Sequence, residues 1–511
     1  MVTMLRGEPG RTRARPKLLA LATVLLSVSC SRGERPIVVA LRSEPGTLDP
    51  HTHGELQAWS LLSNFYDGLV RFSPLTEVEP CLATSWERVD QQTTRFYLRA
   101  GVRFHDGSPF GAEDVAASFR RASRHPRSGL RGYLAGIRDI RADGEGAVLV
   151  ETDGPAPTLA NRLAYLFIVP RTQEHAREIR VPVGTGPYRF VERRADGSVL
   201  ARAVGGWRPR PAVGLVRFVG IDDEGERLRR FLAGELDVAM AIPDEQLVEV
   251  RRRPGFQVVV QPGLSVRLLA VIPAAAPPPV RQALADPRVR RALLLATDRR
   301  HLVEVVLRGN ATVASQYVHP VIFGYDPALV PAPYDPGEAR RLMASAGFAA
   351  GFEAELGHGL IPQEIVASLV EDLGRIGVRL HPVALPFPEL LRRAREAQLP
   401  LVLYARSCMS GDASEFLDTS VHSVDAGRGL GTENYHGYAN PRVDALLEEA
   451  ATATDRERRR SLLQEAQRLV LDDLPVLPLV VQWEHLACRA GLEVVPRNDG
   501  WLWAAAFRLS R

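Results

Sequence analysis

Residues 96–115 read FYLRAGVRFHDGSPFGAEDV, and within this stretch a strand pattern gives way to a helix start. Apolar and polar residues alternate on both sides of residues 100–101, which predicts a β-hairpin over residues 95–104. A turn follows at residues 106–107, and Gly111 stands where a helix would be capped. Strand and helix follow each other at short range, as they do in mixed α/β proteins.

The same mixture extends to both ends of the chain. Residues 37–40 (IVVA) predict a buried strand before a turn-rich loop. Far downstream, Asp286 and Asn440 each precede a proline, a pairing typical of a helix cap and first turn. Thr454 begins a capping box for a further helix, and residues 476–481 (VLPLVV) predict another buried strand. We therefore expect two or three α/β lobes.

Length and composition agree with this architecture. The chain has 511 residues, of which 45% are hydrophobic and 24% charged, as in soluble globular proteins. This length favours more than one lobe. Residues 272–279 (IPAAAPPP) are the most linker-like stretch, and we expect the chain to cross between lobes at or near them.

The amino end has the pattern of an export signal. Five basic residues precede an apolar stretch at residues 18–28, which is too short to span a membrane, and Ser29 and Cys30 follow. A cysteine in this place resembles a lipoprotein signal, in which Cys30 is lipidated. The alternative is simple cleavage nearby, with no role for Cys30.

The net charge of +4 belongs to this signal. Residues 1–29 hold five of the 64 basic residues and one of the 60 acidic ones, so the remaining chain is formally neutral. A nucleic-acid partner would require a concentrated basic surface, and we expect none.

The sequence contains no motif that demands catalysis. Hydrolase, metalloprotease and nucleotide-binding signatures are absent, and we expect no catalytic residue, metal or cofactor. His51 and His53 lie in a Pro/Gly loop, where a metal site is the weaker interpretation. Without Cys30, the cysteines Cys81, Cys408 and Cys488 allow at most one disulfide, and the sequence does not choose the pair.

Eight segments together resemble one family. They are residues 44–50 (EPGTLDP), 65–69 (FYDGL), 82–87 (LATSWE), 96–115, 184–188 (GTGPY), 286–299 (DPRVRRALLLATDR), 334–336 with 346–348 (YDP, AGF), and 438–450 (YANPRVDALLEEA). In this order they are similar to the family 5 extracellular solute-binding proteins, the oligopeptide- and dipeptide-binding lipoproteins of ABC importers.

The resemblance implies an α/β type II periplasmic-binding-protein fold. Two lobes with a hinge surround a ligand cleft, and one lobe carries an inserted subdomain. The implied parts are a signal peptide (1–29), a tether (30–36), a discontinuous lobe I (37–72, 182–270 and 485–511), the inserted subdomain (73–181) and lobe II (271–484).

The function implied is that of an extracytoplasmic substrate-binding protein. It would capture a peptide-like or other small polar solute in the interlobe cleft and deliver it to the permease subunits of an ABC importer, driven by cytoplasmic ATPases. It would act as a monomer in the periplasm or at the cell surface, held to the membrane through lipidated Cys30. Two alternatives remain: an exported enzyme on the same scaffold, and a sensor or scavenger without a transporter.

Two residues that depart from the family pattern bear on which ligand this chain binds. Peptide-binding members carry a cleft tryptophan and an aspartate that pairs with the peptide ammonium; in the register set by Phe416, this chain has Arg406 and Met409 there. A later acid survives as Asp412. Methionine cannot pair with a buried ammonium, whose isolation costs several kcal/mol. The hypothesis is a ligand without a free amino terminus, with an anionic group facing Arg406; the alternative is that Arg406 points to solvent.

For the opposite wall, the resemblance implies a ligand-contacting loop at Glu55, Leu56 and Gln57. It also implies a cleft aromatic near Tyr133. The alternative for Tyr133 is a packed aromatic side chain.

Overall fold

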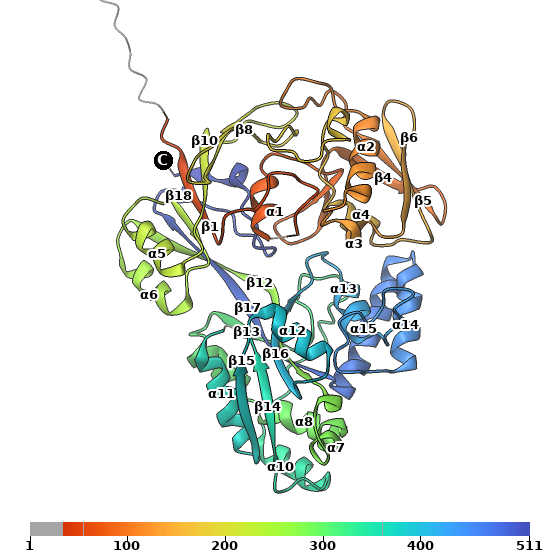
Figure 1. The fold of residues 1–511 in the computed structure, drawn as a ribbon, viewed down its shortest axis with the longest axis vertical. Helices are drawn as coiled ribbons and strands as arrows, with labels where there is room; N and C mark the ends of the chain where they lie inside the picture. Colours follow the sequence, from red (N-terminus) through yellow and green to blue (C-terminus); the bar gives the residue numbers. More distant parts are fainter. Residues whose placement is uncertain (1–33, 55, 360, 511) are drawn as a thin grey trace, which may run out of the picture. The chain divides into compact units, whose positions relative to one another are not determined.

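The computed structural model describes residues 34–54, 56–359 and 361–510, and its largest element is a mixed sheet of eleven strands (Figure 1). In order across the sheet the strands are β15 (Val378–Ala384), β14 (Phe352–His358), β16 (Leu401–Ser407), β12 (Phe256–Val271), β17 (Val476–Arg489), β11 (Val238–Met240), β1 (Ile37–Leu41), β10 (Leu215–Gly220), β9 (Val199–Ala203) and β8 (Tyr188–Arg193), with β13 (Ala311–Val313) beside β17.

Strand β1 is buried on both faces, as its unbroken apolar run predicts. It pairs in parallel with β10 and β11. Because side chains alternate along a strand, Val39 enters one buried cluster and Val38 enters another on the opposite face. Helices α5 (Glu224–Leu232) and α6 (Asp244–Arg252) supply apolar residues to the second of these clusters.

Buried side chains divide the described chain into two lobes. The clusters of the first lobe draw on residues 37–250 and 487–507, and those of the second on residues 264–481. The long antiparallel pair β12 and β17 runs through both sets, with a register shift after Pro262 (Figure 1). The lobes are therefore joined within two strands.

The Pro/Ala stretch 272–279 follows β12 inside the second lobe. It contains the short helix η2 (Pro273–Ala275), and Ile272 and Ala276 are buried in clusters of that lobe. By these clusters the chain crosses between lobes within β12 and β17. The domain boundaries proposed from the resemblance stay a prediction.

Helices pack on both sides of the second lobe's strands. One cluster takes residues from α7 (Val280–Ala285), α8 (Pro287–Ala296), α10 (Pro336–Ser345) and α11 (Gln363–Gly374). The other takes residues from α12 (Phe387–Arg395), α14 (Pro441–Thr452) and α15 (Arg456–Asp473).

The helix starts follow the predicted caps, with one correction. Asp286 and Asn440 cap α8 and α14 through their side chains, as predicted. The capping box at Thr454 is wrong by one residue, because Asp455 caps α15 and accepts a hydrogen bond from the Arg458 amide at 2.7 Å. A carboxylate at this place also favours the positive end of the helix dipole.

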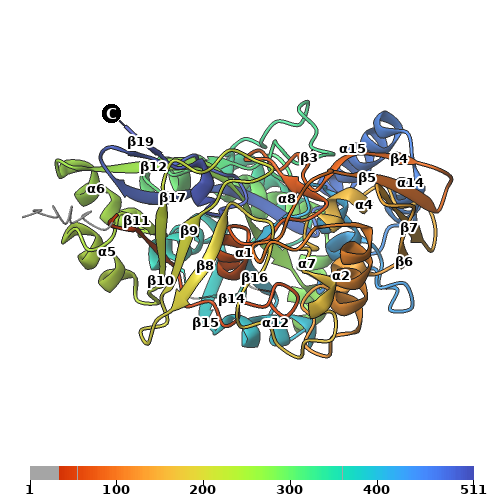
Figure 2. The ribbon, with the colours of Figure 1, turned by 90° about the horizontal axis from the view of Figure 1, so that it is seen from above.

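A separate four-stranded sheet lies in the first third of the chain. Its order is β4 (Ala83–Arg88), β5 (Thr93–Leu98), β7 (Ala147–Thr152) and β6 (Ile137–Ala142). Helix α2 (Ala112–Arg124) packs against it and begins after Gly111, as predicted, with the Gly111 amide donating to Asp114. Figures 1 and 2 both show this subdomain beside α14 and α15.

The predicted hairpin over residues 95–104 is wrong. Strand β5 pairs with β4, which precedes it, and with β7. Gly101 has φ +73°, and residues 102–104 leave the sheet after it. Alternation identified a strand at residues 95–98 but carried no information about its partner.

The remaining elements are short. They are α1 (Leu56–Leu62), β2 (Val70–Phe72), β3 (Val78–Pro80), α3 (Arg131–Leu134), α4 (Leu159–Leu163), η1 (Arg171–Gln173), α9 (Arg299–His301), η3 (Leu302–Val306), α13 (Ser414–Phe416), η4 (Leu417–Val421), β18 (Leu492–Glu493), η5 (Ala504–Ala506) and β19 (Arg508–Leu509).

Candidate ligand-binding site

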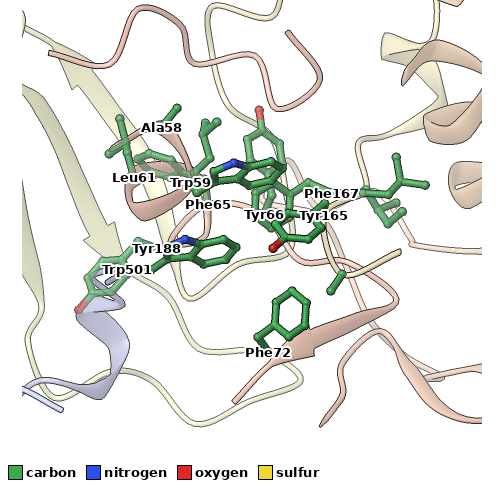
Figure 3. Packing of buried hydrophobic residues seen from close by; sticks show 14 of the residues in the cluster. Ala58, Trp59, Leu61, Phe65, Tyr66, Phe72, Tyr165, Phe167, Tyr188 and Trp501 are labelled. Atoms are coloured by element: carbon green, nitrogen blue, oxygen red, sulfur yellow. The ribbon is translucent and has the colours of Figure 1, made fainter. Parts of the chain in front are cut away.

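Six aromatic residues of the first lobe form a continuous assembly, here called the aromatic wall, and Figure 3 labels all of them except Tyr133. Its members are Trp59, Phe72, Tyr133, Tyr165, Phe167 and Trp501. Trp59 is central: its ring lies 5.0 Å from that of Tyr165 and stacks on Trp501 at 5.6 Å. Rings at these separations attract one another beyond the area they bury.

Distant parts of the sequence supply this wall. Trp59 comes from α1, Tyr165 and Phe167 from the buried run after α4, and Trp501 from the carboxyl-terminal segment. Tyr165 lies in the turn that follows α4 and Phe167 just after it, and both rings contact Trp59.

Tyr133 is the outer member of the wall. Its ring stacks on Tyr165 with centroids 4.2 Å apart. Burial raises the pKa of the Tyr133 phenol to about 12, and the nearby carboxylate of Glu415 adds to the shift. Tyr133 therefore packs on Tyr165 of its own lobe and also lies near charged groups of the second lobe.

The second lobe contributes Arg406, which lies near the end of β16. Its guanidinium pairs with Glu433 at 3.1 Å, and the two side chains are 27% and 34% exposed. Burial alone would lower the pKa of Arg406, but Glu433 and then Glu415 outweigh it and the pKa is raised. Arg406 is thus a half-buried cation that already has a carboxylate beside it.

Met409 and Glu415 complete this side. Met409 packs against buried clusters of both lobes. Glu415 accepts a hydrogen bond from the Ser410 amide at 2.7 Å, yet burial raises the pKa of its carboxyl. A thioether and two acids near a guanidinium therefore lie close to Tyr133 and Tyr165 of the aromatic wall.

Asp412 has a different environment. Both of its oxygens bind the guanidinium of Arg459, at 2.5 and 2.9 Å, and both side chains are 5% exposed. One oxygen also accepts a hydrogen bond from the Ser414 amide. The predicted site residue Asp412 is thereby committed to contacts within the second lobe.

Other predicted site residues fall at or beyond the limits of the described chain. Glu55 and Cys30 lie outside the described residues. Leu56 and Gln57 are the first residues of α1, the helix that carries Trp59. The assignments of Glu55, Leu56, Gln57, Tyr133, Arg406, Met409 and Asp412 to a ligand stay predictions.

Several residues of this region were missed at the level of sequence. Trp59 stands two residues after Gln57, so the motif that pointed to the loop could have included it. Glu415 directly precedes Phe416, so the family motif includes it without giving it a role. Tyr165, Glu433 and Trp501 carry no local signal, because only the fold brings them together.

Of the two histidines, His51 is held by contacts within the first lobe. The ring of His51 lies 2.8 Å from the Phe167 carbonyl and 3.0 Å from the Arg121 guanidinium. Burial lowers the pKa of His51 to about 4. Across the described ranges, no group of three or more His, Cys, Asp or Glu residues is placed to hold a metal ion.

The cysteines that the structure describes are unpaired. Cys81, Cys408 and Cys488 are each free and buried. Burial raises the pKa of all three thiols. The sequence left open which cysteines form a disulfide. Within the described chain, none of them does.

Comparison with known proteins identifies the family. The profile of the bacterial extracellular solute-binding proteins, family 5 middle region, matches residues 77–428. Heme-binding protein A of Haemophilus influenzae is 28% identical over 452 residues, 81% of each chain. The glutathione-binding protein GsiB of Escherichia coli strain K12 is 28% identical over 483 residues, 91% of this chain and 92% of that protein.

Solved structures confirm the fold class. HbpA2 of Haemophilus parasuis superposes with a TM-score of 0.81 at 24% identity, covering 93% of this chain and 100% of that one. The ABC transporter substrate-binding protein CtaP of Listeria monocytogenes has a TM-score of 0.83 at 19% identity, covering 93% and 99%. The mixed α/β architecture is the type II periplasmic-binding-protein fold. With the profile matching most of its length, this chain belongs to family 5 of the bacterial extracellular solute-binding proteins.

Proposed function

We propose that this protein captures a small polar solute, peptide-like or otherwise, between its lobes and delivers it to the permease of an ABC importer. The observation that carries the proposal is the pairing of two unlike surfaces: the aromatic wall on the first lobe and Arg406 with Met409 on the second. Stacking and apolar contact orient a ligand, and a few polar groups select it. The names of the relatives, which bind heme and glutathione, agree with small solutes.

The solute we propose lacks a free amino terminus and turns an anionic group toward Arg406. Met409 offers no charge to an ammonium group. Glu433 neutralises Arg406, but at 34% exposure its carboxylate can turn to water and leave the guanidinium to a ligand. An anionic group of the solute would take the place of Glu433, so the half-buried charge of Arg406 stays paired.

We further propose export through the signal at residues 1–29, with the mature protein held to the membrane by a lipid on Cys30. Apolar character at residues 18–28 and the cysteine that follows support this. Where the structure describes the chain, no helix combines the length and apolar character of a membrane span. We propose a monomeric binding component without catalytic activity.

The test begins with native mass spectrometry of the mature protein, to find a solute that co-purifies. Calorimetry then compares di- to pentapeptides with their N-acetylated forms. We expect no tight binding of the free peptides. Tight binding of ordinary peptides would contradict the proposed solute class.

The role of Arg406 is tested with the co-purified solute and a matched control. Arg406→Ala should weaken binding at least tenfold, because a charged hydrogen bond is worth about 1.5–3 kcal/mol. Arg442→Ala removes an arginine that is also paired with a glutamate, Glu465, but on the surface of α14. Equal affinities of both variants would show that Arg406 does not face the solute.

A further inference from the structure

Two side chains of the first lobe donate hydrogen bonds to the backbone of the second. The Tyr165 hydroxyl donates to the Met409 carbonyl at 2.7 Å. The Asn161 side-chain amide donates to the next carbonyl, that of Ser410, also at 2.7 Å. Asn161 and Tyr165 are four residues apart, so one turn of chain presents both donors to two consecutive carbonyls.

At Gly411 the backbone of the second lobe comes close to the backbone of the first lobe. Its φ is +74°, and a Cβ added there would lie 2.7 Å from the backbone carbonyl oxygen of Thr76 in the first lobe. Real Cβ atoms essentially never come that close to an oxygen, so only glycine lets the two backbones meet.

Both partners of the contact are rigidly held in their own lobes. Tyr165 is 1% exposed and stacks within the aromatic wall. On the other side, the Ser410 amide donates to Glu415, and the Phe323 amide donates to the Gly411 carbonyl at 3.0 Å. The segment that presents the carbonyls of residues 409 and 410 is therefore braced by contacts within the second lobe.

We infer that Asn161, Tyr165 and residues 409–411 form a latch that holds the lobes closed through protein contacts alone. All donors and acceptors of the latch belong to the chain, so it forms whether or not a solute is bound. The inference goes beyond the proposed function because it requires no particular solute.

The free energy that the latch contributes is small enough for closure to be reversible. In the open form these groups form hydrogen bonds with water instead. Each latch hydrogen bond therefore raises the ratio of closed to open molecules by only about fivefold. Two bonds together give about 25-fold, enough to favour the closed form without making it permanent. The apparent affinity equals the affinity of the closed form multiplied by the fraction of molecules that are closed, so the latch also tunes solute binding from outside the contact surface.

The test measures the distance between lobes directly. Spin labels are placed at S85C on β4 and T454C beside α15, both exposed, and distance distributions are recorded on protein freed of bound small molecules by unfolding and refolding. We expect a major short-distance population in the otherwise unsubstituted chain. Tyr165→Phe, which keeps the ring, should lower the ratio of closed to open molecules about fivefold.

Two further variants and a matched control sharpen the result. Asn161→Ala should act like Tyr165→Phe, and Gly411→Ala should open the lobes further. Tyr317→Phe removes a buried hydroxyl that donates to carbonyls within the second lobe only, at 3.1 and 3.3 Å, and should leave the distribution unchanged. Wild-type molecules that are all open, or latch variants that match Tyr317→Phe, would overturn the inference. Neither result bears on whether a solute binds.

Discussion

Asp412 and Arg459 form an ion pair that the second lobe buries almost completely. Removing two charges from water is costly, so such a pair adds little net stability, but leaving one partner alone is worse. Asp412→Asn keeps the shape of the side chain and leaves the Arg459 charge uncompensated. We expect the free energy of unfolding to fall by about 3 kcal/mol, measured by urea denaturation.

An exposed pair provides the control for that experiment. Glu465→Gln breaks the contact of Glu465 with Arg442, whose side chains are 43% and 63% exposed. Water screens this pair, and we expect a loss below about 1 kcal/mol. If both variants lost equally little, Asp412 would not be the structural anchor that its contacts indicate.

A single residue, Asp418, also makes the free energy of unfolding depend on pH. Burial, followed by the charge of Asp412, raises the pKa of Asp418 to about 7, while Arg459 opposes the shift. The folded state therefore holds a proton that the unfolded state has released above pH 4. This contribution to stability is present below the unfolded pKa and is lost as the pH rises from about 4 to 7.

The corresponding variant is Asp418→Asn, which is neutral at every pH. At pH 7.5 we expect it to be more stable than the wild type by about 4 kcal/mol, and at about pH 3 to be equal to it. Thermal unfolding across this range measures the difference. A constant difference at all pH values would show that the carboxyl does not titrate there.

At the scale of elements, two neighbouring residues at the start of α15 differ in their role: Asp455 caps the helix and Thr454 does not. Asp455 accepts a hydrogen bond from the Arg458 amide, whereas Thr454 lies outside the helix. Loss of a helix cap costs about 1 kcal/mol. Asp455→Ala should therefore lower the free energy of unfolding by about that amount, and Thr454→Ala by much less. If Thr454→Ala lost more stability than Asp455→Ala, Thr454 would be the cap, as the sequence predicted.

At the scale of the whole molecule, none of the cysteines that the structure describes links the two lobes. Cys81 belongs to the first lobe and Cys408 to the second, so a disulfide between them would tie the lobes together and oppose hinge motion. We expect the melting temperature to be the same with and without reducing agent. A drop under reduction would reveal a disulfide.

Local patterns predicted much of the fold. The apolar run of β1 and the caps of α8 and α14 are confirmed, since each depends on a few neighbouring residues. The hairpin near residue 101 failed because alternation marks a strand without naming its partner. The candidate site shows the same limit: Arg406 and Met409 stood out in the sequence, whereas the ring stack of Trp59 on Trp501 did not.

The sequence by itself determined the family, the α/β fold class and the neutral charge of the chain after residue 29, because these rest on short motifs and on composition. Only the tertiary structure decided that Asp412 serves Arg459, that Arg406 is paired with Glu433, and that Asn161 and Tyr165 reach the carbonyls of residues 409 and 410. The physical reason is that these contacts join residues up to about 250 positions apart, and side-chain chemistry carries no record of which distant group the folded chain will bring within hydrogen-bond distance.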